Sequence, residues 1–343
     1  MALRTQVNTN FNGDFQIVIK RKTSNGYELQ YPIVEDGVKW ETDRQGSPSK
    51  LTFKVYKDKN GNLAFHEGDT VALQFNDPEA GWKVIFSGYV FNKKRNKNGW
   101  IEVTAYDSLR YFKNKATYVY TNKKASEVVK MIAEDYKLTV GTIEDTSYVI
   151  GSRVEDNQSL FDIIQNALDL TLISTKDMYV LYTEEGKVCL KNAESMRTKV
   201  LINDLVAEDF DYTSSIDDET YTEIELFYDN DETNKREYYN AFDPTNMGKW
   251  GRLRLTESIQ NPANAADRAH KMLELYNRKN RKLNIKNAFG NSECRAGASV
   301  LVNLGLGDIN VNHYMIIEKA THTFKKGEYR MDLTLSGGTE FTT

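Results

Sequence analysis

The sequence predicts a mainly β fold with α+β insertions, in which two tube-like antiparallel β-barrel domains are separated by small α+β modules. Apolar and polar residues alternate in many short segments, as at Val71, Leu73 and Phe75, and this period of two is typical of half-buried strands. Twenty Tyr and fifteen Phe against five Pro also favour strands. Helical apolar stripes appear only after residue 115, so the helices are expected in modules placed between strand-rich parts.

Residues 1–115 are expected to form the first tube-like barrel domain. Phe15–Arg21 and Tyr27–Tyr31 flank a hairpin signal, and about seven strands precede the first helix, which is enough for one small barrel. Gly88 interrupts an apolar run and predicts a bulge or a bend in its strand. The basic segment Lys93–Gly99 ends in Asn-Gly, which predicts a tight hairpin tip.

Residues 116–205 are expected to form an α+β module. The apolar spacing predicts one helix over Lys123–Tyr136 and a second over Leu160–Leu170, the latter capped by Ser159 or Asn157. A hairpin is expected from Met178 to Lys191, with its turn at Glu184-Glu185-Gly186.

Residues 206–343 are expected to form the second tube-like barrel domain with an inserted helix. The first part, up to Thr233, is rich in Asp and Glu but still alternates like a strand around Leu226. Trp250–Leu255 is predicted to be a strand, and Asn261-Pro262 predicts a helix start that continues to about Asn277. The remaining segments to Leu335 have the strand pattern.

The end of the chain repeats the pattern of its first domain. GASVLVNL at Gly297–Leu304 is similar to GDTVALQF at Gly68–Phe75, and the segment from His313 is similar to the segment from Lys83, with a basic tip in the same place. One chain is therefore predicted to carry two similar barrels, and three chains in a ring would present six.

Composition narrows the class of protein. The 343 residues are 40% hydrophobic and 27% charged, as in ordinary globular chains, and a net charge of -4 gives no support to a nucleic-acid partner. No segment has the apolar length of a secretory signal or a membrane span, so we expect assembly in a cytoplasm without membrane insertion. Cys189 and Cys294 are expected to be buried free thiols.

Specific motifs resemble a known family. FSGYV at Phe86–Val90, VTAYDSLRYFKNK at Val103–Lys115 and the following KASEVVKMI helix are similar to tail hub proteins of PBSX-like defective prophages, contractile-tailed phages and phage-tail-like bacteriocins. That family is related to the late-control D proteins of other contractile tails. The resemblance implies a homotrimer that joins the hexameric tail tube to the central spike, with baseplate wedge and tape-measure proteins as further partners.

No set of residues predicts catalysis, a metal site or a cofactor. The four histidines, His66, His270, His313 and His322, have no Cys or His partner at a metal-ligand spacing. No nucleophile is paired with an evident base, and no Gly-rich segment opens a helix in the manner of a phosphate cradle. We therefore expect a protein that is not an enzyme.

Two charged groups of residues are candidates for contacts with partners. The basic tips are predicted to bind acidic neighbours, although charged hairpin ends also serve simply to prevent edge-to-edge pairing; they consist of Lys93, Lys94, Arg95, Lys97, Lys325 and Lys326. The acidic residues Asp217, Asp218 and Glu219 are predicted to face the lumen of a tube and repel DNA phosphates. The competing interpretation of the acidic segment is a solvated face, or the carboxylates of a tail-associated cell-wall hydrolase or carbohydrate-binding module.

Overall fold

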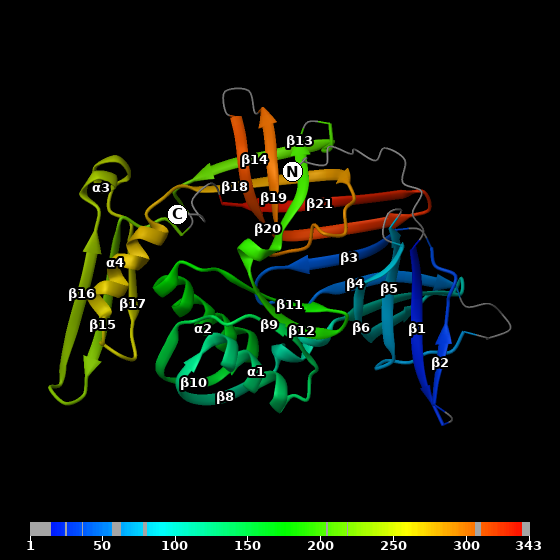
Figure 1. Ribbon diagram of the computed structural model, residues 1–343, viewed down its shortest axis with the longest axis horizontal. Coiled ribbons are helices and arrows are strands. Elements are labelled where there is room, and N and C mark those ends of the chain that lie inside the picture. Colours follow the sequence, from blue (N-terminus) through cyan, green and yellow to red (C-terminus); the bar gives the residue numbers. More distant parts are fainter. Residues whose placement is uncertain are drawn as a thin grey trace.

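The structure is a computed structural model that describes residues 15–24, 26–35, 37–56, 63–77, 81–203, 205–217, 219–305 and 310–337. Most of its strands belong to one 13-stranded sheet, and three smaller sheets lie beside it (Figure 1). The α-helices lie in two modules, one between the two halves of the large sheet and one inserted into the second half, as the sequence predicts.

The first half of the large sheet contains seven strands, which we call the first strand set. In spatial order they run β3-β4-β7-β6-β5-β1-β2. Alternate residues of β5 are buried as predicted, with Val71 and Leu73 fully covered. The bounds of the set are β1 Phe15–Thr23, β2 Gly26–Gln30, β3 Val38–Asp43, β4 Lys50–Tyr56, β5 Thr70–Asp77, β6 Gly81–Arg95 and β7 Trp100–Tyr106, followed by the 3-10 helix η1 Ser108–Lys113.

Gly88 of β6 lies against the backbone of β7. A Cβ atom at this position would stand 2.2 Å from the backbone oxygen of Tyr106, so only glycine fits. Register shifts flank it, between Leu73 and Gln74 on β5 and between Val90 and Asn92 on β6. The bulges that the sequence predicts in this strand are therefore present, but they lie on either side of Gly88, which itself pairs regularly with Val71.

The second half of the large sheet contains six strands, which we call the second strand set. Its order is β14-β18-β21-β20, with β19 beside β20 and β13 parallel to β19. The bounds are β13 Arg197–Asn203, β14 Asp209–Ser215, β18 Asn280–Phe289, β19 Ser299–Gly305, β20 Asn310–Lys325 and β21 Glu328–Ser336.

The two strand sets are joined edge to edge by β3 and β20. The 16-residue β20 pairs with β19 through its first part, and beyond the end of β19 it pairs with β3, from Lys319 opposite Asp43 to Phe324 opposite Val38. The mainly β, antiparallel fold is thus confirmed. Within the described ranges, however, no strand pair closes either set into a barrel, and the two sets are continuous through this ladder instead of being wholly separate.

A module of strands and helices follows the first set. Two strands pair as β8–β10 and three as β11-β12-β9, and α1 and α2 pack against them. Ser159 caps α2, since its hydroxyl accepts a hydrogen bond from Asp162 N at 3.1 Å, which decides between the two predicted caps. The bounds are β8 Lys115–Lys124, α1 Ala125–Asp135, β9 Val140–Ile143, β10 Val149–Ser159, α2 Leu160–Thr175, β11 Tyr179–Glu184, β12 Lys187–Asn192 and η2 Ala193–Met196.

A second small module is inserted between β14 and β18. Its sheet has the order β16-β15-β17 and is covered by α4, and Figure 1 shows it at the opposite end of the molecule from β1 and β2. The strand predicted at Trp250–Leu255 begins later than expected, at Arg254, because Asp243 caps a helix that continues to Trp250. The bounds are β15 Glu223–Asn230, β16 Lys235–Phe242, α3 Pro244–Trp250, β17 Arg254–Ser258 and α4 Ala265–Tyr276.

The hydrophobic core of the first strand set is completed by residues of the second. Phe324 of β20 and Tyr329 of β21 are buried together with side chains of β1, β3 and β5. The second set has its own core, built mainly from β18 to β21. Among the described residues, no helix has the length and apolar character needed to cross a membrane.

Candidate functional site

The junction between β3 and β20 gathers charged side chains that come from opposite ends of the sequence. Arg44, just after β3, donates two hydrogen bonds to the Glu318 carboxylate, at 2.7 and 3.2 Å. Both side chains are mostly buried, which makes this forked pair stronger than a surface ion pair. Lys319 and Asp43 form a second pair at 2.9 Å. These contacts fix the register in which the two strand sets meet.

A buried histidine lies at the centre of the junction. His322 stacks on Trp40, with ring centroids 4.7 Å apart, and its side chain is fully covered. Its Nε2 lies 3.0 Å from the carbonyl oxygen of Cys294, which can only accept, and its Nδ1 lies 2.8 Å from the hydroxyl of Tyr329. The neutral tautomer with the proton on Nε2 satisfies both partners. Burial lowers the pKa of His322 to about 4.

A second buried polar cluster links the junction to the first module. The Asp107 carboxylate accepts hydrogen bonds from the Thr183 hydroxyl at 2.7 Å and from Leu109 N at 3.1 Å. Arg295 lies over the ring of Tyr182 at 4.3 Å and donates to the carbonyl oxygen of Thr183. Burial raises the pKa of Asp107 to about 6, against the lowering effect of these hydrogen bonds. The cluster thus holds β7, β11 and the second strand set together.

These two buried groups act on stability in opposite directions. The pKa of Asp107 is higher in the folded state, so its contribution is present below pH 3.8 and is lost as the pH rises to about 6. The pKa of His322 is lower in the folded state, so its contribution is present above pH 6.5 and is lost as the pH falls to about 4. At ~1.4 kcal/mol per pH unit each effect amounts to about 3 kcal/mol, and between pH 4 and 6 they largely cancel.

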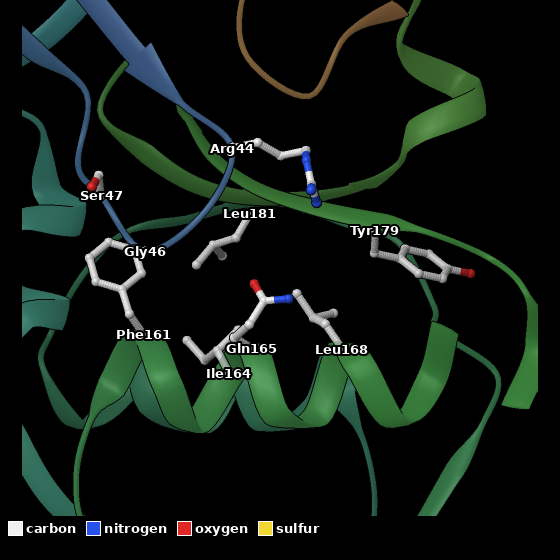
Figure 2. Close-up of a pocket in the computed structure, with 9 residues that line it drawn as sticks. All are labelled: Arg44, Gly46, Ser47, Phe161, Ile164, Gln165, Leu168, Tyr179 and Leu181. Carbon is white, nitrogen blue, oxygen red and sulfur yellow. The ribbon is translucent and has the colours of Figure 1, made fainter. Parts of the chain in front are cut away.

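A small pocket lies beside the junction. Figure 2 shows it between Arg44 and Ser47 of the β3–β4 loop, the upward-facing side chains of α2 such as Gln165, and Leu181 of β11. Its volume of about 20 Å³ holds about one water molecule. The cavity is therefore too small to hold a cofactor or a sugar.

The predicted basic residues lie at the ends of two equivalent hairpins, but they differ in exposure. Lys93 is mostly buried, since its Nζ donates to the carbonyl oxygen of Phe65 at 2.7 Å and lies 3.3 Å from Glu67. Lys94, Arg95 and Lys97 are exposed at the tip of β6. At the other tip, Lys325 and Lys326 are exposed, and Lys325 pairs with Glu328 at 3.2 Å.

The predicted acidic residues lie in the connection from β14 to β15. Asp217 and Glu219 are exposed in the single chain, while Asp218 lies outside the described residues. Further exposed carboxylates, Asp209 and Asp211, stand on β14 and share Lys286 of the neighbouring strand. Sequence reasoning did not single out β14 or the residues of the junction. A signal in the sequence could have found them: KLTFK in β4 is similar to KLNIK in β18. This similarity makes β4 and β18 equivalent, and hence also their neighbours β3 and β14.

Solved structures with this fold include phage tail proteins. The 43 kDa tail protein of prophage MuSo2 from Shewanella oneidensis matches with a TM-score of 0.65 and 10% identity, over 93% of this chain and 98% of that chain. The E. coli c3393 protein matches with a TM-score of 0.53 and 11% identity, over 96% and 78%. That protein is a component of the type VI secretion system with structural similarity to the T4 tail proteins gp27 and gp5. The chain therefore has the fold of phage tail structural proteins.

The family follows from the sequence. The model of the YqbQ-like family matches residues 38–336, and the chain belongs to this family. The uncharacterized protein YqbQ of Bacillus subtilis (strain 168) is 29% identical over 310 residues, covering 88% of this chain and 91% of that protein. The phage-like element PBSX protein XkdQ of the same strain is 28% identical, covering 88% and 92%. The resemblance to proteins of PBSX-like prophages is confirmed.

Proposed function

We propose that this protein is the structural hub of a contractile phage tail or tail-like particle, a trimeric adaptor that joins the hexameric tail tube to the central spike and the baseplate. A protein of the PBSX phage-like element is a relative by sequence, and the fold is shared with tail proteins, which supports a place in the tail. The structural relative in the type VI secretion system is similar to the T4 tail proteins gp27 and gp5, which also supports a place in the tail.

The observation that carries this proposal is that one chain contains two matching strand sets. The hairpin of β6 and β7 has its register shift between Val90 and Asn92, and the hairpin of β20 and β21 has one between Ile317 and Lys319. In each set the first strand of this hairpin pairs with a preceding antiparallel strand, β5 or β19, and the second pairs with a strand of similar sequence, β4 or β18.

Two matching units per chain allow a three-fold ring to present six similar units. Such a ring can meet a six-fold tube on one side and a three-fold spike on the other, and closed rings of identical chains use heterologous contacts of this kind. The tail tube and spike proteins are therefore the proposed direct partners, with wedge and tape-measure proteins as further neighbours. Asp217 and Glu219 are then proposed to face the lumen, where their charge repels DNA phosphates.

The test is reconstitution with the tail tube and spike proteins encoded beside this chain. A complex that contains all three and has three copies of this chain supports the hub. Binding to neither protein, with the chain folded, contradicts it. Cleavage of purified peptidoglycan by the chain alone would instead favour the cell-wall hydrolase.

A further inference from the structure

Several strand edges of the large sheet have no backbone partner in the part of the chain that the structure describes, and those of β6 and β14 are two of them. β14 pairs with β18 on one side only. β6 pairs with β7 up to Arg95, but its ladder with β5 ends near Tyr89, and the backbone contacts on that side end at Val90. Unpaired edges are ready to accept another strand.

The internal repeat shows what kind of strand fits each edge. The matching register shifts make Asn92 of β6 equivalent to Lys319 of β20. On the other side, Thr52 of β4 corresponds to Asn284 of β18, so their partners Lys39 of β3 and Asp211 of β14 also correspond. The free edges of β6 and β14 are therefore the counterparts of the β20 and β3 edges that join the two sets within one chain.

We propose that the free edge of β6 in one copy pairs, antiparallel, with β14 of the neighbouring copy, and that this ladder closes the ring. The inference rests on the proposed function and names the interface that the trimer uses. It repeats between chains the contact that β3 and β20 make within a chain. The occupant of both edges is thus a second copy of this protein.

Transferring the β3–β20 register gives the pairs across the interface. The outward-facing pairs are Asn92 with Ser215, Lys94 with Thr213, and Asn96 with Asp211. Among the inward-facing pairs, Arg95 meets Tyr212 where His322 stacks on Trp40 within the chain. An arginine over a tyrosine ring is a favourable cation–π contact.

The pair of residues just beyond this ladder differs in chemical type between the intrachain junction and the proposed interface, and it differs on both strands. Within the chain, Arg44 binds Glu318, the residue at the register shift of β20. The same positions between chains hold Ile216 and Phe91, so an apolar pair replaces the ion pair. Both apolar side chains are only partly covered in the single chain. At this position two charged residues therefore face each other within the chain, and two apolar residues face each other between chains.

Charge also matches across the proposed interface. Lys94, Arg95 and Lys97 are exposed on the β6 tip, and Asp209 and Asp211 are exposed on β14. Lys94 is the diagonal neighbour of Asp211 in the transferred register, within reach of a long side chain. Opposite charges on the two edges favour this pairing and disfavour pairing of two β6 tips or two β14 edges.

Disulfide trapping in the full chain tests the register. Lys94→Cys combined with Thr213→Cys places two thiols directly opposite, where antiparallel Cα atoms stand ~4.5 to 5.5 Å apart, within disulfide range. Mild oxidation is expected to yield reducible dimers and trimers. Lys94→Cys with Asp209→Cys is the control, because Asp209 lies four residues along the strand, roughly 13 Å away. The native Cys189 and Cys294 are buried and serve as the background.

Charge reversal tests the same interface without cysteines. Lys94→Glu is expected to raise the concentration at which the trimer dissociates by about tenfold, and Asp211→Lys in the same chain is expected to restore it. Lys326→Glu, at the equivalent tip, leaves assembly unchanged. A wild-type trimer that neither cross-links at these positions nor responds to Lys94→Glu overturns this interface while leaving the hub intact. A wild-type chain that stays single even with tube and spike proteins overturns both.

Discussion

The stability of a Phe324→Ala variant tests whether the two strand sets unfold as one cooperative unit. It belongs to the second set by sequence, yet its fully buried ring lies in the core of the first. The ring centroid stands 4.2 Å from that of Tyr329, 5.8 Å from Phe15 and 6.1 Å from Phe75. Phe324→Ala removes these contacts and leaves a cavity, and changes of this kind cost ~3 to 5 kcal/mol.

Urea denaturation at pH 7 measures this cost. Phe242→Ala is the matched control, because Phe242 is 60% exposed and its loss is expected to change the free energy of unfolding by no more than about 0.5 kcal/mol. Tryptophan fluorescence reports mainly on the first set, since three of the four tryptophans, Trp40, Trp82 and Trp100, lie in its strands and only Trp250 lies in the second module. If Phe324→Ala and Phe242→Ala shift the transition equally little, the second set does not complete the first core, and the argument from the junction is wrong.

Three further predictions concern single residues. Gly88→Ala pushes a methyl group into the backbone of β7 and is expected to lower stability by at least ~2 kcal/mol in thermal melts, whereas Gly248→Ala, with open space around it, is not destabilising. Ser159→Ala removes the cap of α2 and is expected to cost about 1 kcal/mol in urea. Asp107→Asn removes the titration that offsets that of His322. The free energy of unfolding of the variant is therefore expected to fall by about 3 kcal/mol between pH 6.5 and 4, whereas that of the wild-type chain stays nearly constant. Equal pH dependence in the two proteins would contradict the opposing pKa shifts.

Local patterns predicted the secondary structure well. The buried face of α1, the Ser159 cap and the hairpin of β11 and β12 are confirmed, because each depends on residues close together in sequence. Helix α2 runs to Thr175, past the predicted end at Leu170, since Ile173 packs into the core of the second module. Such extensions depend on tertiary contacts that periodicity does not report.

The junction was beyond the reach of sequence reasoning for a physical reason. Arg44 and Glu318 are 274 positions apart, and nothing in their local patterns marks them as partners. The repeat was visible as a similarity of strand patterns, but the pairing of β3 with β20 depends on β20 extending past β19. Lys93 is another residue whose surroundings depend on a distant part of the chain. Its position in a basic tip predicted an exposed cation, but its Nζ donates a hydrogen bond to the carbonyl oxygen of Phe65.

The mass of the purified chain in solution, measured by light scattering after size exclusion, tests the central claim most directly. One chain weighs 39.4 kDa, and a hub built from three copies is predicted to have three times that mass when it assembles alone; when it assembles only with the tube and spike proteins, the complex is predicted to contain three copies of the chain. A mass of one chain under all of these conditions would contradict the claim that its two matching strand sets build a closed three-fold ring.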